Sequence, residues 1–174
     1  MIEFFSALAR WLQLTANLVL FGSCVFLTLI WFGKKLPQLG WVRKLEQSFP
    51  WLVGIVLLGL IGILASTAGQ ATGDAINTWD LNAWWEILLR TRVGHLWVAR
   101  FGLALLLLFI VLHLKRMHRV RWHYGLLTVT AALPLTVGSL VSHAGAEEIS
   151  FASVTPYTLH ILLAGVWFGT LPAI

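Results

Sequence analysis

The sequence predicts an all-α integral membrane protein, a bundle in which five helices cross the bilayer. Of its 174 residues, 59% are hydrophobic and only 11% are charged, whereas a soluble domain normally carries roughly a quarter charged residues. The apolar residues fall in runs of about 20, the length that a helix needs to cross a bilayer core about 30 Å thick. The runs lack the alternation of a transmembrane β-strand, and lipid admits only helices or closed barrels, so we expect helices.

Five apolar runs define the expected spans. They cover about residues 7–32, 51–71, 93–114, 124–142 and 156–174. The first run is too long for the apolar region of a signal peptide, and no small-x-small cleavage site follows promptly, so we interpret it as a retained anchor. Pro134 interrupts the fourth run and should kink that helix near Gly138. We expect residues 1–174 to form one transmembrane domain.

The connections between these runs differ in charge, and this predicts the orientation. The segments 33–50 and 115–123 are basic, with Lys34, Lys35, Arg43, Lys44, Lys115, Arg116, Arg119 and Arg121. The segments 72–92 and 143–155 hold most of the acids: Asp74, Asp80, Glu86, Glu147 and Glu148. Because positive loops stay in the cytoplasm, the N-terminus should lie outside, as should the two acidic loops. The net charge of +5 therefore reflects sorting across a membrane rather than nucleic-acid binding.

The first acidic loop contains a short amphipathic segment, DLNAWWEILLRT, from Asp80 to Thr91. Asp80 is a candidate N-cap, and the spacing of Trp84, Trp85, Leu88 and Leu89 makes one apolar face. Tryptophan is favoured where lipid meets water. We therefore expect a short helix that lies along the outer interface.

Three histidines from three different spans fall on the predicted outer side. His95 begins the third span, His143 ends the fourth, and His160 lies about one turn into the fifth. Imidazole is a good ligand for copper, zinc and haem iron, so two or three rings here predict a metal site. Glu147 and Glu148 would add a carboxylate or attract cations. The alternatives are an interfacial role for His95, helix-end hydration for His143, and proton transfer at His160.

Other polar residues have simpler interpretations. His113, His118 and His123 group with the basic cytoplasmic loop, where we expect solvated or phosphate-facing rings. Cys24 lies in an apolar run and should be a buried, inert thiol. Arg100 is costly inside a span; we expect it to pair with a carboxylate (Asp74, Asp80 or Glu86) or a carbonyl, to snorkel outward, or to meet an anionic cofactor.

Three blocks of sequence carry spaced motifs. In LLRTRVGHLWVARFG, residues Thr91, Gly94, Trp97 and Arg100 fill a T-x-x-G-x-x-W-x-x-R pattern. The stretch SLVSHAGA contains a small-x-H-A segment with His143, and LHILLAGVWFGTLPAI contains an L-H-x6-W-x-G-x-L pattern. Together these blocks resemble the copper resistance protein D (CopD) family. The resemblance covers about residues 51–174, and the first span agrees only in character.

This resemblance implies a multi-pass protein of the bacterial inner membrane that binds copper at its periplasmic face and moves it across the membrane, as uptake. It implies a periplasmic copper-binding partner of the copper resistance C type and carries over His143 and His160 as ligands, but not His95. Members of the family normally continue with further spans, so residues 1–174 would be an incomplete family domain.

Two other functions stay open at the level of sequence. Two histidines on facing helices are also suited to hold haem b, with Arg100 against a propionate, in a transmembrane electron-transfer bundle. A scaffold that only docks a periplasmic protein is the third reading. The sequence shows no nucleophile–base arrangement and no hydrolase motif, so we do not expect an enzyme.

Overall fold

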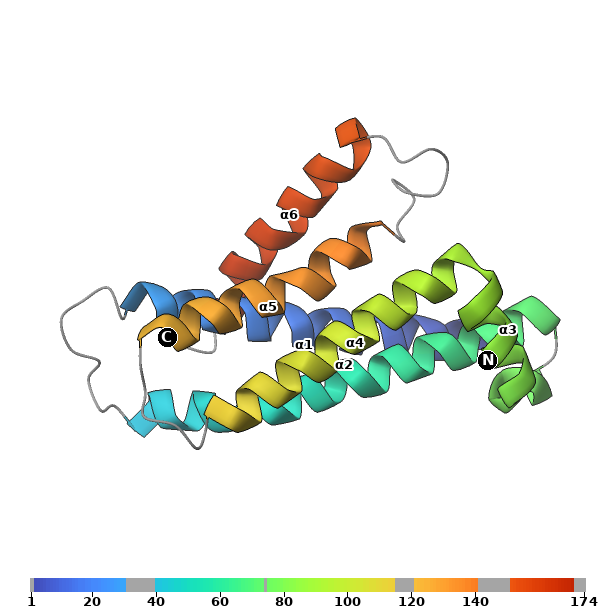
Figure 1. The fold of residues 1–174 in the computed structure, drawn as a ribbon, viewed down its shortest axis with the longest axis horizontal. Coiled ribbons are helices and arrows are strands. Elements are labelled where there is room, and N and C mark those ends of the chain that lie inside the picture. Colours follow the sequence, from blue (N-terminus) through green and yellow to red (C-terminus); the bar gives the residue numbers. More distant parts are fainter. Residues whose placement is uncertain (1, 31–39, 74, 115–120, 141–150, 171–174) are drawn as a thin grey trace.

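The computed structural model describes residues 2–30, 40–73, 75–114, 121–140 and 151–170, and these are almost entirely helical (Figure 1). In chain order the elements are α1 (Ile2–Ile30), α2 (Gly40–Thr72), the 3-10 helix η1 (Ala75–Trp79), α3 (Leu81–Arg90), α4 (Arg92–Leu114), α5 (Arg121–Ser139) and α6 (Phe151–Thr170). Within these ranges there is no strand. The predicted all-α class is confirmed.

Three of the helices are long and apolar enough to cross a membrane. They are Ile2–Ile30, Gly40–Thr72 and Arg92–His113, which correspond to the first three predicted spans. The fourth and fifth predicted spans are helical as well over residues 124–139 and 156–170, in α5 and α6. Their helical state agrees with the sequence analysis, whereas the count of five membrane crossings stays a prediction.

Several helix boundaries differ from those expected, and α1 for example begins at Ile2. Helix α2 begins at Gly40, although residues 33–50 were predicted to be a loop, and it continues through Pro50. The reason is an apolar stripe: Val42, Leu45 and Phe49 are all buried in the main hydrophobic core. Helix α6 begins at Phe151, five residues before the predicted start at Pro156. Helix α5 also runs through Pro134 to Ser139 without a break.

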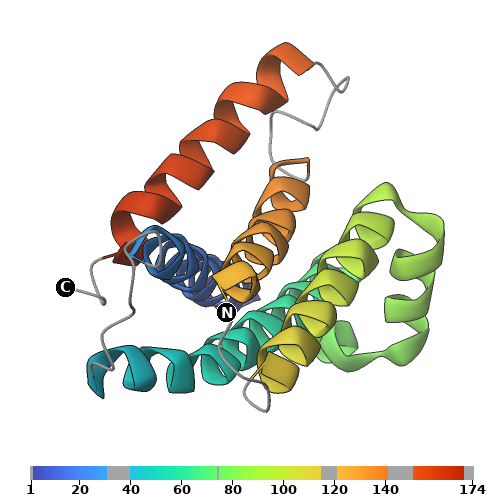
Figure 2. The same ribbon diagram turned by 60° about the vertical axis from the view of Figure 1, so that its left-hand side comes forward.

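The helices alternate in direction, so sequence-distant segments meet at the same end. Figure 1 shows the start of α1, the short elements η1 and α3, and the start of α4 at one end, which we call the α3 end. Figure 2 shows α6 standing apart from α2 and α4 and meeting α1 near its C-terminal end. Helix α1 is central, since it packs against α2, α5 and α6. The core formed around it contains Cys24, which is fully buried, as predicted.

Candidate functional site

The structure describes two of the three predicted outer histidines. His160 lies on α6 and His95 lies on α4, while His143, Glu147 and Glu148 lie outside the described residues. Within the described ranges, no group of three or more His, Cys, Asp or Glu side chains is arranged to hold a metal ion. The predicted ligation of a metal by His143 and His160 therefore stays a prediction.

The orientation of His160 follows from its neighbour Thr158. The hydroxyl oxygens of Thr158 on α6 and Ser139 at the end of α5 lie 2.6 Å apart and share a hydrogen bond. Successive residues on an α-helix are about 100° apart, so a side chain two positions on points to the opposite face. His160 is accordingly exposed. Because α6 begins at Phe151, His160 lies nine residues into the helix, deeper along it than the single turn expected.

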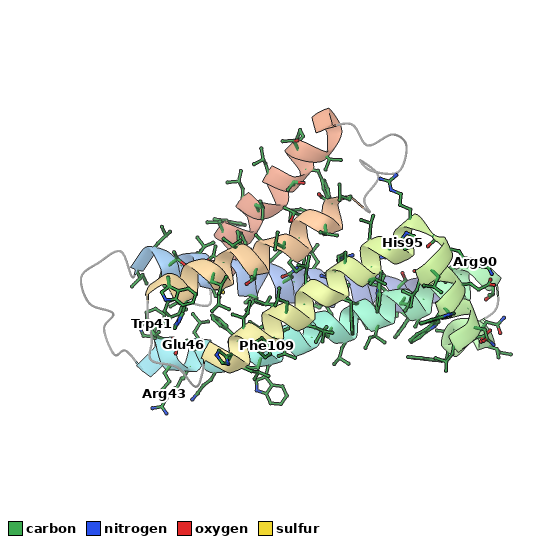
Figure 3. All side chains as sticks on the ribbon, viewed as in Figure 1. Trp41, Arg43, Glu46, Arg90, His95 and Phe109 are labelled. Carbon is green, nitrogen blue, oxygen red and sulfur yellow. The ribbon has the colours of Figure 1, made fainter. Side chains whose placement is uncertain are left out.

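His95 is bound into the turn between α3 and α4. Its ring nitrogen Nε2 lies 3.1 Å from the Leu89 carbonyl oxygen, and the side chain is exposed at the α3 end (Figure 3). The turn is tight at Gly94, where a Cβ atom would lie 2.0 Å from the Ile87 carbonyl oxygen. The structure thus gives His95 a local structural contact within the turn.

Helix α3 has the predicted N-cap. The Asp80 carboxylate accepts a hydrogen bond of 2.9 Å from the Asn82 backbone N–H. At the other end of the helix, Glu86 and Arg90 form an exposed ion pair at 3.6 Å. No residue of α3 is buried. Its helical structure is confirmed, and its position at a membrane interface stays a prediction.

Arg100 does not pair with either of the described acids proposed for it. Asp80 caps α3 and Glu86 pairs with Arg90, and Asp74 lies outside the described residues. Instead, Arg100 Nη2 donates a 2.7 Å hydrogen bond to Gln13 Oε1 on α1. The prediction of an acid partner is therefore wrong for Asp80 and Glu86. The guanidinium turns inward to a neutral carboxamide because α4 packs with α2 and α5 around α1.

The four residues of the T-x-x-G-x-x-W-x-x-R pattern each make a specific contact. Thr91 Oγ1 accepts a 2.9 Å hydrogen bond from the Gly94 N–H, and Gly94 allows the close approach to α3. Trp97 Nε1 donates to the Leu60 carbonyl oxygen on α2 at 2.7 Å, and its ring stacks on Phe101. With Arg100 on Gln13, the pattern links α4 to three other helices.

Sequence reasoning missed two buried polar residues of α1, Gln13 and Asn17. They are 3% and 0% exposed, and Asn17 has no hydrogen-bond partner for either amide atom among the described residues. Arg100 Nε is also buried without a partner there. The sequence signal was present: two carboxamides four residues apart in an apolar helix lie on one face, and polar residues in spans usually face the bundle interior.

The opposite end of the bundle has its own polar contact. The Tyr124 hydroxyl on α5 donates to the Glu46 carboxylate on α2. His123, expected to be solvated, is only 6% exposed and packs edge-on against Trp122. The expectation was wrong because α5 begins at Arg121, which places His123 on the buried side of the first turn. His113 is exposed and stacks on Phe109, labelled in Figure 3.

The comparisons with known proteins bear on the family of the chain. Residues 1–152 match the family model described as the copper resistance protein D-like, N-terminal domain. No curated protein and no solved structure matches the chain. Because the family model covers most of the 174 residues, this chain belongs to the copper resistance protein D-like family.

Proposed function

We propose that the chain is a copper-handling protein of the bacterial inner membrane, which binds copper at its periplasmic face and moves it across the membrane as uptake. One observation carries the proposal: the family match over residues 1–152 joins a copper-related family to a chain with three helices suited to cross a bilayer. The chain would bind copper as its cargo.

The proposed copper ligands are His143 and His160. His160 is the candidate on α6 because it is a titratable group in a mostly apolar helix, and its imidazole faces away from α5 and is exposed. A titratable group on such a helix is costly and therefore indicates function, and imidazole suits copper. Glu147 and Glu148 would supply a carboxylate beside the histidines. His95 is the weaker additional ligand, since its Nε2 already contacts the Leu89 carbonyl.

We propose that the α3 end faces the periplasm. Figure 3 shows Arg90 and His95 at this end and Arg43 with Glu46 at the other, where the basic connections belong. The positive-inside rule then gives an external N-terminus.

Large apolar side chains of η1 and α3 are exposed, namely Ile76, Trp79, Leu81, Trp85 and Leu89. They suit a helix at the lipid interface, beside which a periplasmic copper-binding protein of the copper resistance C type would deliver the ion.

The test is copper stoichiometry of the purified chain, measured by mass spectrometry after loading and desalting. We expect His143→Ala and His160→Ala to lose most of the bound copper. His113→Ala is the matched control. His113 is also exposed, but it lies at the C-terminal end of α4, away from the α3 end of the bundle. Unchanged copper in both site variants would remove the proposed ligands. A visible spectrum of the same samples tests the haem alternative. A Soret band that the unaltered chain shows and these variants lose would indicate that the two histidines bind haem rather than copper.

A further inference from the structure

We propose that the middle of the bundle holds a small monovalent inorganic anion, of the chemical class of chloride, bound by Arg100 on α4 and Asn17 on α1 beside Gln13. The site lies among α1, α2 and α4 and involves none of the histidines proposed to bind copper. It stands whether or not the chain binds copper.

Gln13 and Asn17 are buried, and Arg100 is partly buried beside them. Gln13 and Asn17 are one turn apart on α1, and Arg100 reaches Gln13 with its Nη2. On the side of α2, Gly59 faces Gln13 so closely that a Cβ atom there would lie 2.6 Å from the Gln13 Cβ. Asn17 is near the middle of α1, which runs from Ile2 to Ile30. The group therefore lies near the middle of a helix long enough to cross a membrane.

The buried donors lack acceptors. Arg100 Nε and both amide atoms of Asn17 are buried without a hydrogen-bond partner among the described residues. Native structures almost always satisfy such groups with protein, water or a bound ion. Arg100 also forms no ion pair with any acid in the described ranges. The guanidinium Nε–H and the Asn17 amide N–H are both donors, so the missing ligand must be an acceptor.

The charge defines the class of this ligand. A single guanidinium in an apolar bundle is neutralised by one negative charge, and hydrogen bonds from an ionised donor to an anion are strong. A Cβ atom added at Gly138 on α5 would have Arg100 as its nearest neighbour, at 3.5 Å from Nη2, which is ordinary contact. On this side, the guanidinium thus faces a glycine of α5 rather than a side chain. Since a single negative charge is enough to neutralise Arg100, a halide suits the site, with a water for the Asn17 carbonyl.

A bound anion would also lower the electrostatic repulsion between the bundle and a cation. An unpaired guanidinium in the middle of a bilayer is costly and repels other cations. Neutralised by a halide, Arg100 no longer opposes a positive ion that moves along the bundle. The anion would thereby be a resident part of the protein rather than its cargo.

Chloride-35 NMR of the purified chain in detergent tests the proposal. Broadening of the chloride line should be saturable, and bromide should reverse it. We expect Arg100→Gln and Asn17→Leu to weaken the affinity by roughly tenfold or more, the effect of losing a hydrogen bond to a charged group. Arg92→Gln is the matched control, because Arg92 is an exposed arginine of the same helix. Melting temperatures in sodium gluconate show that each variant is folded.

The outcomes separate clearly. Specific broadening that Arg92→Gln keeps and both site variants lose supports the site. No broadening with the unaltered chain overturns it, as does equal broadening for the chain and Asn17→Leu. Asn17→Leu keeps the test valid if Arg100→Gln does not fold, since it replaces an unpaired buried amide with an apolar side chain.

Discussion

Helix α1 is joined to α4 and to α6 by opposite means. In the middle of the bundle, α1 meets α4 through polar side chains, Gln13 and Arg100. At its crossing with α6, α1 makes its closest approach through glycine: a Cβ atom at Gly22 would lie 2.2 Å from the Gly165 carbonyl oxygen and 2.6 Å from the Gly169 Cα. Ser23 Oγ also donates to the Gly169 carbonyl oxygen at 3.1 Å. The contact with α4 depends on a hydrogen bond between polar side chains, and the contact with α6 depends on glycines that let the two backbones approach.

This difference shows how the N-terminal half of α6 is held. Of residues 154–170, only Gly165 and Gly169 are buried, and both lie in the half of α6 that crosses α1. The half that carries His160 is tied to the bundle by the Ser139–Thr158 hydrogen bond. The position of the proposed copper ligand therefore depends on a glycine crossing at a distance from it, whereas the Arg100 group is enclosed by several helices.

The largest expected effect comes from filling the crossing. Gly22→Val would force backbone atoms of α1 and α6 apart, and overpacking against backbone should lower the free energy of unfolding by about 3 kcal/mol. Unfolding by SDS titration measures this. Gly54→Val is the control, because a Cβ atom at Gly54 meets nothing within 4 Å. Equal stability of the two variants would mean that α6 is not held by this crossing.

The polar contact in the middle is tested by a double-mutant cycle. Arg100→Met and Gln13→Leu each remove one partner of the 2.7 Å hydrogen bond. Each single variant leaves a buried polar group unpaired, so we expect a coupling free energy of about 1.5–3 kcal/mol, typical of a hydrogen bond to a charged group. SDS unfolding of the four proteins gives the value. Additive effects would contradict the contact.

A smaller effect is expected where α4 meets α2. Trp97→Phe keeps the ring but removes the 2.7 Å hydrogen bond from Nε1 to the Leu60 carbonyl oxygen. The loss should be about 1 kcal/mol of unfolding free energy. Trp167→Phe is the comparison, since Trp167 is 74% exposed on α6 and should change stability little. A larger loss of unfolding free energy for Trp167→Phe than for Trp97→Phe would contradict the expected stabilisation by the hydrogen bond between α4 and α2.

The smallest effect belongs to the surface of α3. Glu86→Gln removes the exposed ion pair with Arg90, in which the two side chains are 67% and 78% exposed. Such pairs contribute below about 0.5 kcal/mol, and less at high salt. The measurement is thermal unfolding at two salt concentrations. A shift as large as that of Trp97→Phe would show that α3 is anchored more firmly than its exposure indicates.

The sequence predicted the elements well where one physical signal dominated. Apolar length located α1, α2 and α4, and the Asp80 cap located α3. It failed where tertiary packing decided. Val42, Leu45 and Phe49 extend α2 into a segment that its charges marked as a loop, and His123 is buried although its neighbours are basic.

The contact between Arg100 and Gln13 shows a different limit of prediction from sequence. Arg100 was recognised as costly from its position in an apolar run, but its partner could not be found because Gln13 is 87 residues away in the chain. Which face of α6 carries His160 likewise depends on the contact of Thr158 with α5. Neither a charge pattern nor a periodicity contains that information.

The most direct test of the proposed function is X-ray absorption at the copper edge of the loaded, purified chain. Outer-shell scattering from imidazole is distinct from that of carboxylate or sulfur ligands, so the spectrum reports the ligands themselves. We expect imidazole scattering from two rings, which falls to one in His160→Ala and is unchanged in His113→Ala. A spectrum without imidazole, or one that His160→Ala leaves unaltered, would contradict copper binding by His143 and His160.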